Sequence, residues 1–203
     1  MQPSVAVQAC CHELIESITR HDFADIVSTA QLAHLNQTRR DGRPYIVHPL
    51  EVLRIVRQFY PDDRRTQLVA VLHDAMEDGI ENFGSLDELE SHVIGSISDQ
   101  AEAEAVLDVV RLLTHSSSQS YVGYVVGLLG HRTALRVKLA DMLNNLSESP
   151  SPNQLKKYAA AIRRLELVGG SPPSGISIQH WAKLKRLIVN VAEARCSLVG
   201  MLI

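Results

Sequence analysis

Aromatic residues and alternating apolar and polar patterns are both scarce in this sequence. Phe, Trp and Tyr make up only 4% of the 203 residues, although hydrophobic residues as a whole make up 45%. Half-buried β-strands require a two-residue alternation, and almost no stretch of the chain shows one. The sequence therefore predicts an all-α fold of helices packed on helices. Its length is sufficient for a single domain with a substantial core.

Long apolar runs and excess positive charge are also missing. No run approaches the roughly 18 residues of a membrane span, and Glu13 and Glu16 interrupt the N-terminal apolar pattern, which argues against a signal peptide. We therefore expect a cytoplasmic protein with no membrane partner. A net charge of −3 offers no broad basic face for phosphate backbones, so we also expect no nucleic-acid partner.

Cysteine is too sparse to form a framework. Cys10 and Cys11 are adjacent and Cys196 is remote. An odd number of cysteines in this arrangement suggests neither disulfides nor a Cys-x-x-Cys metal site. We interpret them as buried or incidental thiols.

Helical periodicity and boundary residues divide the chain into helices joined by short loops. Pro49 and Pro152 suit the first position of a helix, Ser85 and Glu88 form a capping-box pattern, and the Gly- and Pro-rich stretch 169–175 is the clearest linker. The expected helices cover about 4–20, 22–38, 49–60, 68–78, a short helix from 85, 101–114, 121–130, 135–146, 152–167 and 178–200.

Charge is concentrated at the end of the apolar helix 68–78. His73, Asp74, Glu77 and Asp78 follow a run of aliphatic residues, and Gly79 ends the helix. On a continuous helix these four side chains share one broad face. Carboxylates this close repel one another and lose solvation beside an apolar run, so a cation is expected among them. A metal ion is the simplest candidate.

Two further residues extend this cluster to the order H…HD…D. His48 stands at a helix start and Asp141 on a helix about 70 residues after Asp74. Two imidazoles and two carboxylates leave coordination positions open, which suits Mn²⁺, Fe²⁺ or Mg²⁺ better than a closed structural zinc site. Such an ion activates water and polarises a phosphoryl oxygen, while Glu77 and Asp78 remain to orient or deprotonate the water. The pattern predicts hydrolysis.

Three motifs in this order resemble the hydrolase half of the RelA/SpoT family, and more closely the small stand-alone alarmone hydrolases built from that half. They are RRDGRPYIVHP at 39–49, LHDAMED at 72–78 and VKLADMLNNL at 137–146. The resemblance implies an all-helical HD-domain phosphohydrolase that uses one Mn²⁺ per chain. Its implied reaction removes the 3′-pyrophosphate from (p)ppGpp, a nucleotide alarmone.

The same resemblance implies a role for each matching residue. The implied metal ligands are His48, His73, Asp74 and Asp141. The residues implied at the hydrolytic water are Glu77 and Asp78. The residues implied in substrate binding are Arg39, Arg40, Lys138, Asn145 and Tyr158. Arg39 would pack on the base, Asn145 would lie near the ribose and base, and Lys138 would contact either a phosphate or a carboxylate.

Departures from the family pattern leave alternatives open. The chain has Gly79 where the family usually has Thr, and Met142 and Asn144 where long members often have a basic residue and His. An adenine alarmone, (p)ppApp, or another phosphorylated nucleotide is therefore an alternative substrate. A non-catalytic nucleotide-sensing module is an alternative of another class. The complete ligand set and the retained Glu77–Asp78 pair argue against it.

The resemblance also divides the chain. It implies an N-terminal helical extension over 1–29, an HD hydrolase core over 30–167, and a linker with a C-terminal helix over 168–203. That last helix either seals the core or forms a homodimer face. Alarmone synthesis is not expected, because a synthetase half needs far more than the 36 residues after the match.

The remaining histidines have no partner at ligand spacing. His34 either supports the site or is a core histidine. The histidines expected at the surface or in loops are His12, His21, His92, His115, His131 and His180.

Overall fold

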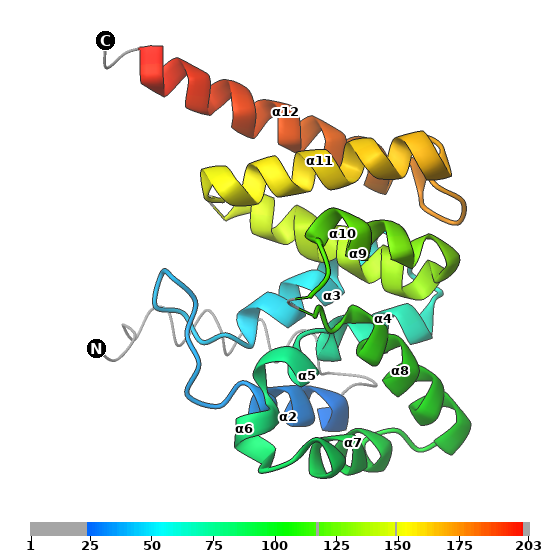
Figure 1. Ribbon diagram of the computed structural model, residues 1–203. Coiled ribbons are helices and arrows are strands. Elements are labelled where there is room, and N and C mark those ends of the chain that lie inside the picture. The colour runs from blue at the N-terminus through cyan, green and yellow to red at the C-terminus, as the bar shows by residue number, and fades with distance from the viewer. Residues whose placement is uncertain (1–23, 117, 149, 201–203) are drawn as a thin grey trace. The chain divides into compact units, whose positions relative to one another are not determined.

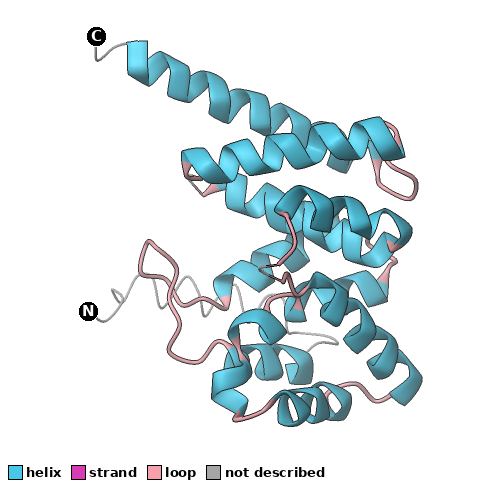
Figure 2. Ribbon diagram, in the orientation of Figure 1, coloured by secondary structure: helices cyan, strands magenta, loops and turns pink. Residues whose placement is uncertain are grey.

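The computed structural model describes residues 24–116, 118–148 and 150–200, with side chains described as far as residue 194. The expected helix 4–20, the start of the helix at 22, and Cys10, Cys11, Cys196, His12 and His21 lie outside these described residues and side chains. Within them every regular element is a helix, and Thr38 and Pro44 form one isolated β-bridge (Figures 1 and 2). The predicted all-α fold is confirmed.

The chain divides by its internal contacts into two compact units, Met1–Thr114 and His115–Ile203. The N-terminal unit contains α2 (Ala24–Ala33), α3 (Val47–Phe59), α4 (Arg64–Leu72), α5 (Ala75–Asp78), α6 (Ile80–Phe83), α7 (Leu86–Gly95) and α8 (Gln100–Leu113). The C-terminal unit contains α9 (Tyr121–Gly127), the 3₁₀ turn η1 (Leu128–Gly130), α10 (Arg132–Ser147), α11 (Pro152–Gly169) and α12 (Ile178–Gly200). The boundary falls in the polar loop after α8, and the division at 29 and 167 stays a prediction.

Helix α4 is the centre of the N-terminal unit. Every residue from Thr66 to Leu72 is buried, and the helix packs against α2, α3 and α8. It begins where Asp63 accepts a hydrogen bond from the Thr66 backbone N–H at 3.1 Å, which satisfies an otherwise unpaired donor. Burial on every side fixes its C-terminal end, and that end carries His73.

Two helix pairs build the C-terminal unit: α9 packs on α11, and α10 packs on α12. Ser151 and Gln154 form a capping box at the start of α11, with Pro152 at the first turn as predicted. After α11 the chain folds back so that α12 also packs along α11 (Figure 1). Arg136 donates two hydrogen bonds to the Gly175 carbonyl, at 2.9 and 2.7 Å, and so ties the predicted linker to α10.

The expectation that His180 lies at the surface is wrong. Its side chain is fully buried on α12 and hydrogen bonds to the backbone of Leu139 on α10. Burial, assisted by the charges of Lys183 and Arg136 and opposed by the Leu139 bond, lowers the His180 pKa to about 4. The imidazole is therefore a neutral part of the core at pH 7.

The other described histidines from that group are where the sequence predicts them. His92 and His131 are exposed. His115 lies in the loop after α8, where its Nε2 donates to the Gln119 carbonyl at 2.9 Å. None of the described helices combines the length and hydropathy needed to cross a membrane.

Candidate metal centre and nucleotide site

The predicted continuous helix 68–78 is interrupted at its most important residues. Helix α4 ends at Leu72, and α5 begins at Ala75 with Asp74 as its N-cap residue. The His73 Nδ1 donates to the Ala70 carbonyl at 2.9 Å. In an uninterrupted helix that carbonyl accepts from the Asp74 N–H, so the side chain competes with the helix. The His-Asp pair therefore sits at a junction between two helices.

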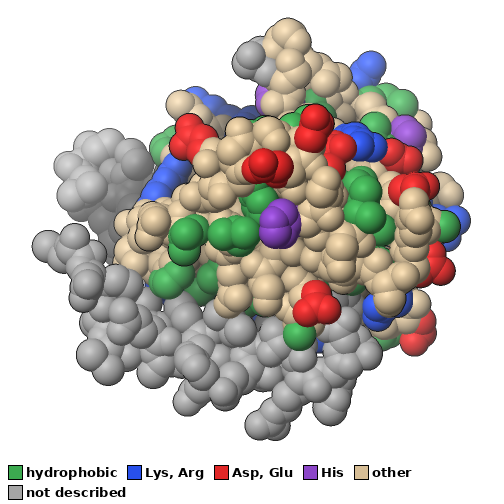
Figure 3. Space-filling model, turned by 90° about the horizontal axis from the view of Figure 1, so that it is seen from below, with side chains coloured by type: hydrophobic (Ala, Val, Ile, Leu, Met, Phe, Trp, Pro, Cys, Tyr) green, Lys and Arg blue, Asp and Glu red, His purple; other side chains and the backbone are tan. Residues whose placement is uncertain are grey.

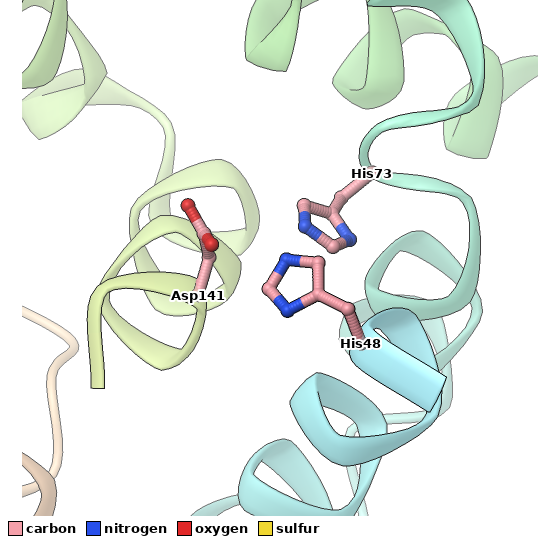
Figure 4. Close-up of side chains that lie close together, drawn as sticks. All are labelled: His48, His73 and Asp141. Carbon is pink, nitrogen blue, oxygen red and sulfur yellow. The ribbon is translucent and has the colours of Figure 1, made fainter. Parts of the chain in front are cut away.

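That junction brings three ligand atoms together within the N-terminal unit. The Nε2 atoms of His48 and His73 lie 3.4 and 3.2 Å from Asp74 Oδ2. The two imidazoles are 5.1 Å apart between ring centroids and meet edge to face. Figure 4 shows both rings, one from the start of α3 and one from the end of α4. Both are almost completely buried.

The proton positions on His73 leave one nitrogen free for a cation. Because Nδ1 donates to a carbonyl, Nε2 of the neutral ring carries a lone pair. This buried Nε2 makes no hydrogen bond in the described part of the chain, although Asp74 Oδ2 is close. A lone pair facing a carboxylate is unfavourable unless a cation lies between them. These donors fit a divalent metal ion.

The two aspartates of this region have opposite electrostatic environments. Burial raises the pKa of Asp74, but the adjacent imidazoles of His73 and His48, in their protonated forms, outweigh burial and hold the pKa well below its usual value. Burial and the nearby Asp74 charge raise the pKa of Asp78, against the hydrogen bond from Tyr45. Asp74 is thus suited to hold a cation, and Asp78 to accept a proton.

Tyr45 joins these aspartates and was not identified from the sequence. Its hydroxyl lies 2.9 Å from Asp74 Oδ2 and 3.2 Å from Asp78 Oδ2, donating toward both. Its ring stacks on His34 at 4.6 Å and meets His48 edge to face at 5.8 Å. Its position three residues before His48, at the entrance to α3, was the available signal. Tyr45 is the residue that connects the arginine loop to the histidines.

His34 supports this arrangement from α2's C-terminal side. It is buried, and its Nδ1 hydrogen bonds to Gln37 Oε1 at 2.8 Å. Burial, opposed by the Gln37 bond, lowers its pKa. Gln37 in turn donates to the Asp78 carbonyl at 2.5 Å. Of the two interpretations of His34, a support of the site or an ordinary core histidine, these contacts favour the first.

Gly79 is required by packing rather than by flexibility. Its φ is −107°, which any residue adopts, but a Cβ here would lie 2.7 Å from the Ala33 Cβ and 2.5 Å from the Ala75 carbonyl oxygen. Asn82 Nδ2 donates to the Ala33 carbonyl at 2.7 Å and fastens the same contact. Helix α2 thus approaches the backbone directly after Glu77 and Asp78.

The arginine loop is closed by its own backbone. Arg39 N–H donates to the Arg43 carbonyl at 2.8 Å, and Gly42 adopts a φ of +84° that favours glycine. Arg43 pairs with Asp41 at 2.7 Å. The Arg39 guanidinium lies 5.7 Å from the centre of the Tyr45 ring, whereas Arg40 is exposed. Arg39 is therefore placed beside the cluster through Tyr45.

Helix α10 of the C-terminal unit holds the other predicted ligand. Asp141 is buried; its Oδ2 pairs with Lys138 Nζ at 2.8 Å, and its Oδ1 accepts from Asn145 Nδ2. Lys138, Asp141 and Asn145 thus form one hydrogen-bonded row along the helix (Asp141 is drawn in Figure 4). Of the two roles predicted for Lys138, the structure contains the ion pair with a carboxylate.

Tyr158 belongs to an aromatic and cationic group beside this row. Its ring lies 5.6 Å from the Tyr121 ring, and Lys157 Nζ lies 4.4 Å from the Tyr121 centroid. Lys138 Nζ is 5.9 Å from the same ring. The Tyr121 hydroxyl is buried without a hydrogen-bond partner among the described residues, and burial raises its pKa. Tyr121 is a second residue that was not assigned from the sequence.

The predicted site residues therefore form two groups, one in each unit. The N-terminal group contains His48, His73, Asp74, Asp78 and, through Tyr45, Arg39. The C-terminal group contains Lys138, Asp141, Asn145 and, through Tyr121, Tyr158. Glu77 on α5 and Arg40 in the loop are exposed, and each remains a predicted site residue.

Comparison with known proteins gives several curated relatives. The guanosine-3′,5′-bis(diphosphate) 3′-pyrophosphohydrolase of Vibrio cholerae is 29% identical over 140 residues, which cover 68% of this chain and 19% of that protein. The bifunctional (p)ppGpp synthase/hydrolase SpoT of Escherichia coli is 27% identical over 140 residues, with the same coverage. The GTP pyrophosphokinase of Streptomyces antibioticus is 26% identical over 167 residues, 82% of this chain and 19% of that protein.

This chain spans about a fifth of the length of these relatives. No family model matches it. The names of the relatives include both 3′-pyrophosphohydrolases and a GTP pyrophosphokinase. The three motifs that carry the resemblance supply most of the residues in the two groups described above. The resemblance of this chain to hydrolases of the RelA/SpoT family, predicted from those motifs, is thereby confirmed.

Proposed function

We propose that this protein is a metal-dependent pyrophosphohydrolase that removes the 3′-pyrophosphate from a nucleotide alarmone of the (p)ppGpp type. The observation that carries the proposal is the convergence of His48 Nε2 and His73 Nε2 on Asp74 Oδ2. The names of the relatives support the choice of substrate.

The proposed metal ligands are His48, His73, Asp74 and Asp141. Each of His48, His73 and Asp141 is buried and offers one ligand atom. Nitrogen and carboxylate oxygen suit Mn²⁺, with Fe²⁺ or Mg²⁺ as less favoured ions. The ion, when bound, supplies positive charge that polarises a phosphoryl oxygen. Lys138 and Asn145 hold the Asp141 carboxylate in one orientation and so prepare it for this role.

The protein's own groups would carry the proton steps. Glu77, exposed on α5, would take a proton from the water that attacks the 3′-linked phosphorus. The bond from that phosphorus to the ribose 3′-oxygen breaks, and the 3′-oxygen takes up a proton to give a hydroxyl and pyrophosphate. Asp78, with its raised pKa and its contact to Tyr45, would hold the water in line.

Substrate binding would use the cations and rings of both groups. Arg39, whose guanidinium already lies beside an aromatic ring, would stack on the base. Arg40 and Lys138 would meet phosphates, and Asn145 the ribose and base. Tyr158 and the hydroxyl of Tyr121 would line the pocket, because that buried hydroxyl has no partner within the described chain.

The decisive experiment incubates the Mn²⁺-loaded protein with ppGpp, ppApp, GTP and ATP and identifies products by ³¹P NMR. We expect pyrophosphate release from the 3′-pyrophosphorylated nucleotides alone, abolished by chelation. Turnover of ppApp but not ppGpp would assign the adenine alarmone instead. Binding without any product would identify a nucleotide sensor, and full activity after exhaustive chelation would disprove the metal assignment.

Two variants separate metal binding from proton transfer. Asp141→Asn should lower metal affinity and so reduce the rise in melting temperature that the metal gives to the protein. Glu77→Gln should reduce kcat by about 10²–10⁴-fold with metal content intact. Asp62→Asn, an exposed loop substitution, is the control. Calorimetric titration beside steady-state kinetics makes the comparison, and loss of metal in Glu77→Gln would make Glu77 a ligand.

A further inference from the structure

Charge is divided very unevenly between the two units. The C-terminal unit, His115–Ile203, contains 11 of the 20 Lys and Arg residues but only 4 of the 23 Asp and Glu residues, a net charge of +7. The N-terminal unit accordingly has a net charge of −10. The whole-chain value of −3 conceals this asymmetry, which is itself a signature of an interaction with a charged partner.

Part of the positive charge of the C-terminal unit is exposed on α11 and α12. Lys156, Arg163 and Arg164 on α11 and Arg186 on α12 are exposed, and none of them makes an ion pair within the described part of the chain. Three exposed arginines of the N-terminal unit are paired instead: Arg54 with Glu51, Arg65 with Glu102 and Arg111 with Glu90. Four unpaired cations on two adjacent helices are therefore available to a partner.

Aliphatic side chains accompany these cations. Leu167 is 73% exposed, Val168 53%, Ile178 70% and Val189 52%. Leu167 and Val168 stand in the last turn of α11, Ile178 is the first residue of α12, and the two helices pack on each other. We call the eight residues the basic face: Lys156, Arg163, Arg164, Leu167, Val168, Ile178, Arg186 and Val189. Apolar side chains among charges of one sign are typical of a surface that docks on a protein.

A face of opposite sign exists on the N-terminal unit. On α6 and α7, Glu81, Asp87 and Glu88 are exposed and make no ion pair with any described residue. Ile80, Leu86 and Ile94 beside them are 36%, 42% and 37% exposed. We call these six residues the acidic face. Figure 3, which views the molecule from the side where α7 lies in Figure 1, shows acidic side chains next to hydrophobic ones.

We infer that the partner is a second copy of this chain, with the basic face of one copy docking on the acidic face of the next. Each face supplies what the other lacks, unpaired charge of opposite sign and exposed aliphatic groups. A face-to-same-face dimer would bring four cations against four cations, which repel. A long polyanion would be repelled by the net −10 of the other half of the molecule. Unlike faces join copies head to tail. This inference is independent of the proposed activity.

The test measures mass by sedimentation velocity over a range of protein and salt concentrations. We expect an assembly at low salt that dissociates as salt screens the charges. Arg163→Glu with Arg164→Glu should weaken assembly by about tenfold or more, and so should Asp87→Lys with Glu88→Lys. Arg54→Glu, which reverses an exposed charge on α3 outside both faces, should leave it unchanged. Circular dichroism verifies that each variant is folded.

Mixing the two charge-reversed proteins gives the decisive result. Each variant alone has one altered face that has lost its charge complementarity, but in the mixture the unaltered acidic face of one variant meets the unaltered basic face of the other, so a heterodimer should form. Failure of the mixture to assemble would overturn the inference. So would a wild-type protein that stays monomeric at all concentrations, or an assembly insensitive to both reversals. Binding of the monomer to duplex RNA through the same arginines would assign the basic face to a nucleic acid instead.

Discussion

His180 offers a quantitative test of the packing between α10 and α12. Its folded pKa of about 4 lies below the ordinary value of 6.5. At pH values between about 4 and 6.5, His180 is therefore protonated in the unfolded chain but neutral in the folded chain. Stability consequently falls as the pH decreases through this window. For one such group the loss between pH 7 and pH 5 is about 2 kcal/mol.

The assay is urea unfolding of the chelated protein at pH 7, 6 and 5, for wild type and for His180→Gln. Glutamine keeps an N–H donor for the Leu139 carbonyl but cannot titrate. Asp78 and His34, whose pKa values are also shifted, are common to both proteins and cancel in the difference. His92→Gln, at an exposed position, is the control. If wild type and His180→Gln lost stability in parallel, His180 would not be a neutral core residue.

Three substitutions probe the N-terminal group. Arg39→Ala should weaken nucleotide binding by about 1–3 kcal/mol, as judged by calorimetry, with metal content unchanged. If the variant bound every nucleotide as tightly as the wild-type protein does, the loop would be a solvated surface and not part of the site. Tyr45→Phe should weaken metal binding about 10- to 100-fold, because the hydroxyl orients Asp74; an unchanged metal titration would contradict this. Gly79→Ala should destabilise the protein by about 1–3 kcal/mol in urea unfolding. Gly95→Ala, with open space around the new Cβ, is its control and should not destabilise.

Local sequence signals predicted where some helices begin, although the expected helix 22–38 ends at Ala33 and the expected helix 68–78 is divided. Helix α7 begins after Ser85, whose side chain accepts a hydrogen bond from the Glu88 N–H. Helix α11 begins at Pro152. Both depend on residues within one turn of each other, so the sequence alone contains the cause. The order of His48, His73, Asp74 and Asp141 likewise predicted which residues to consider, because the chemistry of the donors is a property of residue type.

Contacts between distant segments could not be predicted in this way. His180 is buried because α12 folds back on α10, and nothing in its neighbouring residues indicates this. The break at His73 depends on a side-chain hydrogen bond to Ala70 that a periodic pattern does not contain. Tyr45 acts through aspartates 29 and 33 residues away. The burial of His180 and the contacts of Tyr45 are created by tertiary packing, whereas the break at His73 is a local side-chain contact that overrides helical periodicity.

The contact between Ala33 and Gly79 also limits how this protein can diverge. Because a Cβ at 79 would meet both the Ala33 Cβ and the Ala75 carbonyl oxygen, a larger residue at 79 requires a smaller residue at position 33 together with a displacement of the backbone at Ala75. Threonine, frequent in the resembled family at the position of Gly79, would therefore depend on a compensating change in α2. We therefore expect substitutions at positions 33 and 79 to occur together, as an epistatic pair beside Glu77 and Asp78.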